Sequence, residues 1–306
     1  MSPRIFANTT LSDTAKRVLE GFEIVENNAS DSTLTQCEVL MAWPSRAGKE
    51  LLGRMPGLKM VQALSAGVDG LDFAALPAGT LVYSNAGAYT ESVAEHAWGL
   101  LLGAAKGLPS RRERVVPRRL KDKTLLVIGC GSIGSEIARL AKSIGMKTVG
   151  VSRSFKVPEL FDERHEAEQL RKVIGTADAI AITLPLTMQT LGLIDYSMLM
   201  LSNTNVTIVN VGRGETVSEE GLVKWLRERP ESRFTTDVFW KKDGKETFDA
   251  QAWDFPNFSG TLHVSGVPLG ESLDHPMIEA AKNVRRFLET GEALNKVNLN
   301  EYLPVS

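Results

Sequence analysis

The sequence has few of the features that direct a protein to an oxidising compartment or a membrane. It contains only 2 cysteines, Cys37 and Cys130, in 306 residues, which argues against a disulfide framework. Its start lacks the basic, apolar and small-residue regions of a secretory signal. The longest apolar run, 97–105, is about half the length that a membrane span needs. We therefore expect a cytoplasmic protein with no membrane partner.

An excess of one charge is also missing. The 35 lysines and arginines balance 37 acidic residues, which leaves a formal charge of -2. This balance argues against nucleic acid as the main partner. With 4 histidines and 2 cysteines, the sequence has no cluster of His, Cys, Asp and Glu at metal-ligand spacing, so we expect no metal. A small molecule is the expected partner.

Short apolar segments alternate with helical patterns along the chain. We expect helices over 14–19, 92–106, 132–144, 166–175, 218–229 and 277–287, and strands over 4–8, 22–26, 37–43, 58–64, 80–85, 125–128, 147–151, 179–185, 207–212, 234–239 and 260–266. Strands that alternate with helices predict parallel sheets. The order from residue 125 onward predicts a doubly wound α/β fold.

A glycine turn follows the strand at 125–128. Gly129, Gly131 and Gly134 form G-x-G-x-x-G directly before a helical pattern. The first glycine permits a tight turn, the second lets the backbone approach a pyrophosphate, and the third permits close packing of helix on strand. The turn residues Ser132 and Ile133 open a helix whose N-terminal N–H groups favour phosphate. The pattern predicts a dinucleotide site, although a structural turn is the alternative.

The next strand ends on Ser152, Arg153 and Ser154, where a site for NAD places an Asp or Glu that accepts from the ribose 2′-hydroxyl. A carboxylate there would repel a 2′-phosphate. Two hydroxyl donors and a guanidinium would bind it. We expect a preference for NADP, with NAD as a weaker cofactor; a solvent-facing Arg153 and a relaxed preference are the alternative.

Seven segments together resemble the D-isomer-specific 2-hydroxyacid dehydrogenase family. Besides the glycine turn they are "SAGVDGLD" (65–72), "SVAEHA" (92–97), "LPLTMQT" (184–190), "NVGRGETV" (210–217), "TDVF" (236–239) and "LHVSG" (262–266). The resemblance implies a Rossmann dinucleotide-binding domain over 93–269. It also implies a smaller, flavodoxin-like α/β domain for substrate, made of 1–92 and 270–306, and a homodimer built on the helix after "SVAEHA".

The resemblance also implies the central residues of the site. Arg213 would clamp the carboxylate of a 2-oxo acid and polarise its carbonyl, unless it is a surface arginine. His263 would act as the general acid that protonates the carbonyl oxygen. Further contacts would come from the backbone of Ala66, Gly67 and Val68 to the substrate carboxylate, and from Pro185, Thr187 and Asp237 to the cofactor. For Asp237 the alternative is a helix N-cap.

The carboxylate that pairs with the family's histidine is out of place in this chain. It usually stands five residues after the aspartate of "DVF", and this position is Lys242 here. An insertion in the loop could have moved the carboxylate to Glu246; Asp243, or no partner from this loop, are the alternatives.

These residues predict an NADP-preferring reductase that converts a small 2-oxo acid to the D-2-hydroxy acid. Glyoxylate and hydroxypyruvate are the substrates that the family suggests. The displaced glutamate favours a second possibility, a cofactor-sensing binding protein with little turnover. Oxidation of formate is a weaker third.

Overall fold

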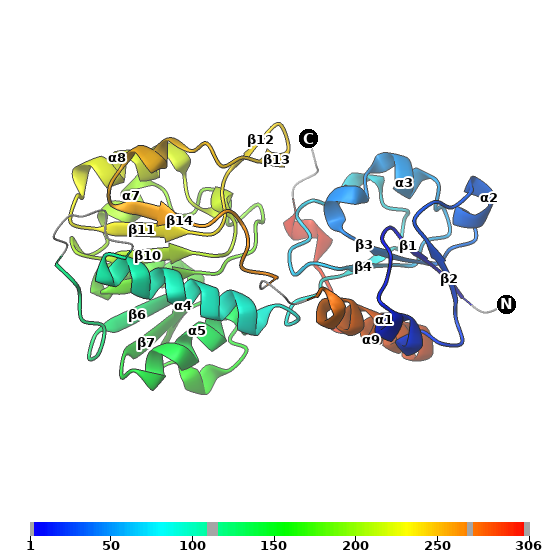
Figure 1. Ribbon diagram of the computed structural model, residues 1–306, viewed down its shortest axis with the longest axis horizontal. Helices are drawn as coiled ribbons and strands as arrows, with labels where there is room; N and C mark the ends of the chain where they lie inside the picture. The colour runs from blue at the N-terminus through cyan, green and yellow to red at the C-terminus, as the bar shows by residue number, and fades with distance from the viewer. Residues whose placement is uncertain (1–2, 109–115, 268–271, 303–306) are drawn as a thin grey trace. The chain divides into compact units, whose positions relative to one another are not determined.

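The computed structural model describes residues 3–108, 116–267 and 272–302, which form two compact units (Figure 1). The first consists of Met1–Tyr89 with Leu269–Ser306 and the second of Thr90–Pro268. The first predicted boundary, after residue 92, lies three residues beyond the observed one. The second, between 269 and 270, lies outside the described residues. In the described parts, no helix is both long and apolar enough to cross a membrane.

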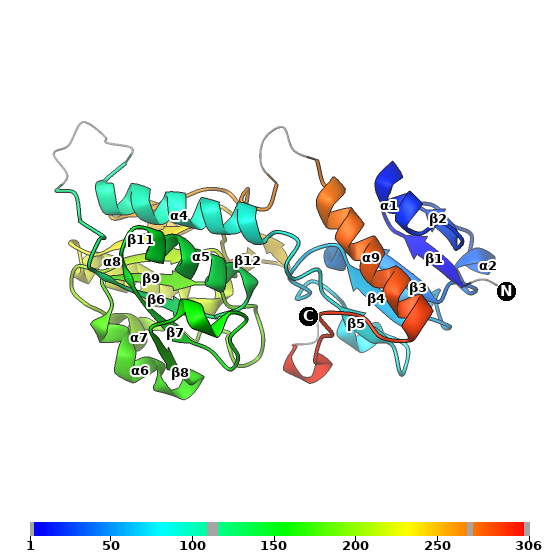
Figure 2. The ribbon, with the colours of Figure 1, turned by 90° about the horizontal axis from the view of Figure 1, so that it is seen from below.

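The first unit contains a parallel sheet with the strand order β2-β1-β3-β4-β5. This is the flavodoxin-like order, as expected. Its strands are β1 (Arg4–Ala7), β2 (Glu23–Glu26), β3 (Val39–Ala42), β4 (Met60–Ala63) and β5 (Leu81–Tyr83); its α-helices are α1 (Asp13–Val18), α2 (Asp31–Leu34), α3 (Lys49–Gly53) and α9 (Asp274–Thr290). The last helix, α9, packs beside α1 and against β4 (Figure 2). The end of the chain thus completes the core of its beginning.

Both faces of this sheet are covered. Val39 and Met41 pack into one hydrophobic cluster with α9, whereas Leu40 and Ala42 pack into another with α3. Alternate side chains of one strand thus enter different cores, and an inner strand such as β3 is a continuous apolar run. This explains why the periodicity of the sequence shows strands here without a polar face.

The second unit contains a seven-stranded parallel sheet with the order β14-β11-β10-β9-β6-β7-β8. Its strands are β6 (Thr124–Ile128), β7 (Lys147–Val151), β8 (Glu163–His165), β9 (Ala179–Ile182), β10 (Thr207–Asn210), β11 (Arg233–Thr236) and β14 (Phe258–Gly260). The first six follow the doubly wound order 3-2-1-4-5-6, so the predicted fold class is confirmed. The order reverses between β6 and β9.

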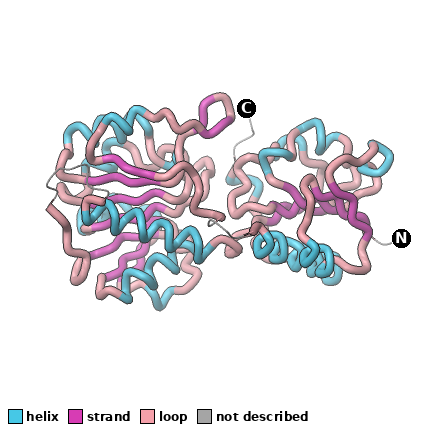
Figure 3. The backbone as a smooth tube through the Cα atoms, in the orientation of Figure 1, coloured by secondary structure: helices cyan, strands magenta, loops and turns pink. Residues whose placement is uncertain are grey.

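Helices cover both faces of this sheet (Figure 3). Helix α4 (Thr90–Lys106) contacts α5 (Ser132–Ser143), β10 and β11. Helices α6 (Leu170–Val173), α7 (Tyr196–Met200) and α8 (Glu219–Glu228) bury side chains in the cluster on the other face, around Ile180 and Ile208. The carboxyl ends of the strands remain at one edge of the sheet, where loops follow them.

Two local predictions were wrong, and one hairpin was missed. The predicted strand 260–266 ends at Gly260, so His263 lies in a loop after β14. The predicted helix 166–175 is a series of short helical turns around α6. The polar segment after β11 forms a two-stranded hairpin, β12 (Lys241–Lys242) and β13 (Lys245–Glu246), that the sequence analysis did not predict.

Candidate active site

The predicted site residues of the second unit follow successive strands of one sheet. Gly129 comes directly after β6, Ser152 after β7, Asp237 after β11, and His263 three residues after β14. Arg213 follows β10 by three residues. All of these strands are parallel, so their carboxyl ends lie at the same edge. Ligands of doubly wound sheets bind at this edge, where the strand order reverses.

The glycine turn has the geometry that a pyrophosphate site requires. Gly129 adopts a left-handed φ of 99°, which favours glycine. A Cβ on Gly134 would lie 2.1 Å from the carbonyl oxygen of Gly129, so α5 can approach the strand only with glycine there. A Cβ on Gly131 would meet no protein atom within 4 Å. The backbone of Gly131 therefore faces open space, where a phosphate can approach the start of α5.

The end of β7 carries the residues that we expect at the adenosine ribose. Arg153 and Ser154 are exposed and Ser152 is partly exposed. The N–H group of Ser152 donates to the carbonyl of His165 at 3.1 Å, so the end of β8 borders the same place. The structure thus places two hydroxyl groups and a guanidinium at this strand end.

Arg213 stands between two glycines that the packing requires. A Cβ on Gly212 would lie 2.4 Å from the carbonyl oxygen of Leu184, and one on Gly214 would lie 2.2 Å from the carbonyl carbon of Phe239. The carbonyl of Arg213 accepts hydrogen bonds from the Asn210 side chain (3.0 Å) and the Thr216 hydroxyl (2.7 Å). The backbone of Arg213 is therefore fixed on both sides, with its side chain half-buried.

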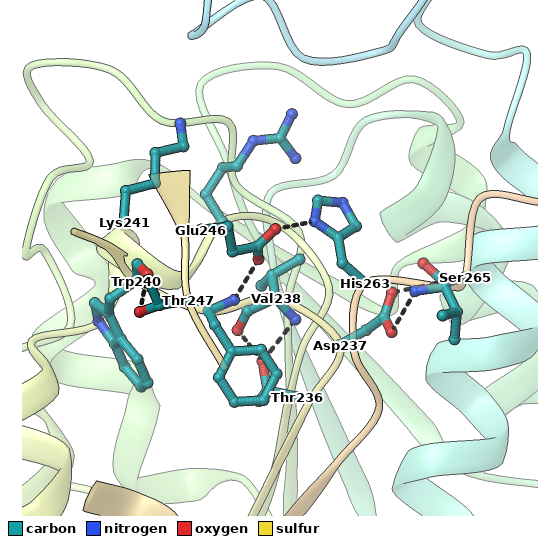
Figure 4. Close-up of polar contacts among 12 residues, drawn as sticks. Thr236, Asp237, Val238, Trp240, Lys241, Glu246, Thr247, His263 and Ser265 are labelled. Atoms are coloured by element: carbon teal, nitrogen blue, oxygen red, sulfur yellow. Dashed lines mark hydrogen bonds and ion pairs between the residues drawn. The ribbon is translucent and has the colours of Figure 1, made fainter. Parts of the chain in front are cut away.

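Asp237 is completely buried and supports the loop that carries His263 (Figure 4). Its carboxylate accepts from the Thr261 hydroxyl (2.6 Å) and from the N–H groups of Val264 and Ser265 (3.0 Å each). Its carbonyl accepts from the N–H group of His263 at 2.8 Å. Burial raises the pKa of Asp237, but the hydrogen bonds from Ser265, Thr261 and Val264 outweigh it and hold the pKa below its usual value.

These contacts decide between two interpretations of Asp237. The N-cap interpretation is wrong, because the residues after Asp237 lead to the β12 strand and not into a helix. The predicted contact with the nicotinamide carboxamide stays a prediction. The observed contacts instead hold His263 at a left-handed φ of 53°, which is uncommon for a histidine.

Glu246 lies next to His263. Its Oε2 atom is 2.5 Å from His263 Nδ1, and its Oε1 atom accepts from the N–H group of Phe239 at 2.6 Å (Figure 4). The hairpin β12–β13 makes this possible, because Asp243 and Gly244 form its two-residue turn with φ of 51° and 72°. Asp243 thus occupies the turn, and Lys242 forms an ion pair with Asp249 at 2.9 Å. Of the carboxylates considered, Glu246 is the one that meets the histidine.

The remaining predicted residues lie in two places. Pro185 is exposed after β9, and the buried Thr187 shares hydrogen bonds with Thr190. Ala66, Gly67 and Val68 follow β4 in the first unit, where the Ser65 hydroxyl donates to the carbonyl of Gly67 at 2.7 Å.

The sequence analysis missed two residues that brace this edge. The Thr183 hydroxyl donates to the carbonyl of Gly129 at 2.5 Å and so fixes the glycine turn from β9. His96, on α4, lies 2.7 Å from the Thr261 hydroxyl and 3.6 Å from the Asp237 carboxylate. The pattern "VAEHA" placed His96 on a helix but gave no sign of its contact with Asp237, which lies 141 residues later in the chain.

Comparisons with known proteins identify the family. The family model described as "D-isomer specific 2-hydroxyacid dehydrogenase, NAD binding domain" matches residues 81–265. A glyoxylate reductase of Aeropyrum pernix is 33% identical over 267 residues, which cover 81% of this chain and 79% of the reductase. The chain belongs to the D-isomer-specific 2-hydroxyacid dehydrogenase family.

Other family members extend the comparison. A solved structure of a D-isomer specific 2-hydroxyacid dehydrogenase family protein from Aeromonas salmonicida has a TM-score of 0.80 at 28% identity, and the match covers 98% of this chain and 100% of that one. A D-3-phosphoglycerate dehydrogenase of Bacillus subtilis is 27% identical over 296 residues, which cover 90% of this chain but 55% of the dehydrogenase. The chain thus has the family's nicotinamide-dinucleotide-binding domain, and spans about half of this longer relative.

Proposed function

We propose that this protein is an NADP-preferring reductase that converts a small 2-oxo acid to the D-2-hydroxy acid. The observation that carries the proposal is the contact between Glu246 and His263, at the same sheet edge as Arg213 and the glycine turn. A carboxylate beside one ring nitrogen orients the imidazole and fixes which nitrogen carries the proton. The other ring nitrogen then serves as a proton donor.

Each part of the site has a role in this reaction. When bound, the reduced nicotinamide cofactor supplies a hydride to the carbonyl carbon of the substrate. Arg213 holds the substrate carboxylate and polarises the carbonyl, and His263 gives a proton to the carbonyl oxygen. Glu246 holds the proton at Nδ1 of His263, so that Nε2 faces the substrate. The backbone of Ala66, Gly67 and Val68 would add N–H groups for the carboxylate.

Ser152, Arg153 and Ser154 support the preference for NADP, because they offer donors and no carboxylate to a 2′-phosphate. We expect the substitution Arg153→Ala to raise the KM for NADPH about ten-fold or more and to leave the KM for NADH nearly unchanged. Arg119→Ala is the matched control, since Arg119 pairs with Asp122 before β6, at the other end of the strands. Equal losses with both cofactors would contradict the assignment.

The first test of the function is the oxidation of NADPH and NADH, followed by absorbance, with glyoxylate, hydroxypyruvate, pyruvate and phosphohydroxypyruvate. Turnover with NADPH well above NADH is the expected result. Binding of NADPH without turnover of any 2-oxo acid would favour the cofactor sensor. That alternative depended on a missing carboxylate, and the position of Glu246 beside His263 removes its basis.

The proposal includes a homodimer formed through α4 in the cytoplasm. The exposed side chains of Leu102 on α4 and Leu108 just after it support this surface. The buried, unpaired Cys37 and Cys130 support a reducing compartment. Light scattering tests the dimer: Leu102→Glu should yield monomers, and an unchanged mass would exclude this surface.

A further inference from the structure

Helix α4 contacts the loop of His263 at two points. Ser92 and His96 lie four residues apart on this helix, so their side chains leave the same face. The Ser92 hydroxyl donates to the carbonyl of Ser265, and Nε2 of His96 lies 2.7 Å from the Thr261 hydroxyl oxygen. Thr261 comes two residues before His263 and Ser265 two residues after it. The helix therefore holds the loop on both sides of the proposed acid.

The hydrogen bonds around Thr261 run in one direction. Its hydroxyl oxygen lies 2.6 Å from Asp237 Oδ1. The pKa of Asp237 lies below its usual value, so its carboxylate carries no proton at neutral pH and can only accept. The single hydroxyl proton of Thr261 must therefore go to Asp237, and the Thr261 oxygen must accept from His96 Nε2. A histidine can carry this proton in its neutral form and in its charged form, so the contact does not depend on the charge of His96.

Thr261 is the link through which His96 reaches Asp237. His96 Nε2 is 3.6 Å from Asp237 Oδ1, which is too far for a direct hydrogen bond. Asp237 in turn holds His263, because its carbonyl accepts from the N–H group of His263 at 2.8 Å. The first donor of this chain sits on a fixed element, since α4 packs against α5, β10 and β11.

His263 depends on such support because its backbone conformation is an uncommon one. A left-handed φ, here 53°, persists in a histidine only where the surrounding contacts fix it. The ring must also stay in reach of Glu246, whose Oε2 atom is 2.5 Å from Nδ1. A loop released from α4 can relax toward a more favourable φ and carry the ring away from this carboxylate.

We propose that His96 is a positioning residue for the proton transfer: it acts through Thr261 and Asp237 and keeps His263 aligned with Glu246. The inference rests on the proposed function and adds to it a residue that takes no part in the reaction itself. Ser92 supports the same loop from one turn earlier on the helix.

Two substitutions of His96 form a matched pair for the test in the full chain. Both His96→Asn and His96→Gln replace the ring with a neutral amide, but only glutamine is long enough to bring its amide nitrogen to the place of Nε2. His96→Asn therefore removes the donor to Thr261, and His96→Gln keeps one. Ser92→Ala removes the second contact of the helix. Glu95→Gln, at an exposed neighbour on α4, is the control.

The assay measures NADPH oxidation with glyoxylate, hydroxypyruvate, pyruvate and phosphohydroxypyruvate. Each kcat is expressed per cofactor-binding site, and the sites are counted by fluorescence titration with NADPH. This count separates positioning from folding, because a variant that only folds less well has fewer sites but an unchanged rate at each site. Melting temperatures are measured on the same samples.

We expect His96→Asn to lower kcat per site about ten-fold and to change the KM values for NADPH and the 2-oxo acid less than about two-fold. An interaction that aligns the acid for the reaction lowers kcat and leaves substrate binding intact. His96→Gln should stay within about three-fold of the unmodified protein, and Ser92→Ala should lose about five-fold in kcat. Glu95→Gln should match the unmodified protein.

Three results would overturn the inference. Equal kcat values for His96→Asn and His96→Gln would mean that a donor at Nε2 does not matter. Fewer sites with an unchanged rate at each site would make His96 a residue of the fold alone. In both cases the proposed function would stand. Failure of the unmodified protein to reduce any of the four acids would overturn the proposed function and this inference with it.

Discussion

Asp237→Asn should weaken both the fold and the activity, because one buried carboxylate holds the whole loop around His263. The two carboxylate oxygens receive the N–H groups of Val264 and Ser265 separately, and one of them also receives the Thr261 hydroxyl. An amide of the same shape has only one acceptor oxygen. Its NH₂ group must face one of these donors at 3.0 Å.

The expected size follows from these contacts. The variant loses at least one hydrogen bond to a charged acceptor, worth about 1.5–3 kcal/mol, and leaves a buried donor without a partner. We expect a loss of about 2–4 kcal/mol in the free energy of unfolding. At about 2–4 °C for each kcal/mol, the melting temperature should fall by roughly 4–16 °C. Displacement of His263 by about 1 Å should lower kcat/KM on the order of 100-fold.

The effect should also depend on pH. The folded state lowers the pKa of Asp237, so the carboxylate stabilises the fold above its unfolded pKa of about 3.9. This contribution is lost as the pH falls through the lower, folded pKa. The gap in stability between the unmodified protein and Asp237→Asn should therefore be constant from about pH 5 to 8 and narrow below about pH 4.

Calorimetry across this pH range, with Asp249→Asn as the control, tests the reasoning. Asp249 is an exposed residue whose carboxylate pairs with Lys242, so its substitution should change the free energy by less than about 0.5 kcal/mol. Equal melting temperatures for Asp237→Asn and the unmodified protein would refute the argument. A gap that stays constant down to pH 3 would show that the charge of Asp237 is not what stabilises the loop.

Two further pairs of variants separate roles that the structure assigns to neighbouring residues. Glu246→Gln should lower kcat about 10-fold to 100-fold at neutral pH, because it removes the charge beside His263. Asp243→Asn should retain the kinetics of the unmodified protein, since Asp243 lies in the hairpin turn. The opposite result in a steady-state assay would make Asp243 the partner of His263. Gly131→Ala should fold normally but bind NADPH at least about ten-fold more weakly in a fluorescence titration, because the added methyl group enters space that the phosphates would use. Gly134→Ala should instead unfold at a lower temperature even without cofactor, since its Cβ would meet the Gly129 carbonyl at 2.1 Å, and equal stability of the two glycine variants would contradict this distinction.

The sequence carried enough information to predict most strands of the two sheets, because these strands are largely apolar and alternate with helices. The edge strand β8 (Glu163–His165) was missed, because it consists of polar residues. The glycines at 129, 131 and 134 were also predictable, because each glycine has a separate steric role and their spacing identifies the turn. The hairpin β12–β13 was not predicted, because its strands are made of lysines and a glutamate and have no apolar face. The dipeptide Asp243-Gly244 is a typical signal for a two-residue hairpin turn, and it would have placed Lys241 opposite Glu246.

Long-range contacts account for the other omissions. The loop around His263 owes its shape to Asp237, 26 positions earlier, and to Thr261, which His96 braces from α4. Local pattern therefore ended the last strand too late, at Gly266 instead of Gly260. Buried hydrogen bonds of this kind fix a backbone conformation that local propensity does not favour, as the left-handed φ of His263 shows.

The regular hairpin limits how the length of its arms can change if the Glu246 carboxylate is to keep its orientation. The side chains of successive residues in a strand point to opposite faces. If each arm gained one residue at its base, Glu246 would point away from His263. An extension of each arm by two residues at the base would turn the side chain of the acid toward its original face again, but would place it farther from the sheet. Insertions at the base of the hairpin must therefore add residues to each arm in pairs to keep the orientation of the acid, whereas insertions at its tip leave Glu246 in place. A sequence pattern that allows only one spacing between Asp237 and the acid that contacts His263 would not match this chain. A pattern that allows spacings differing by an even number of residues would match it.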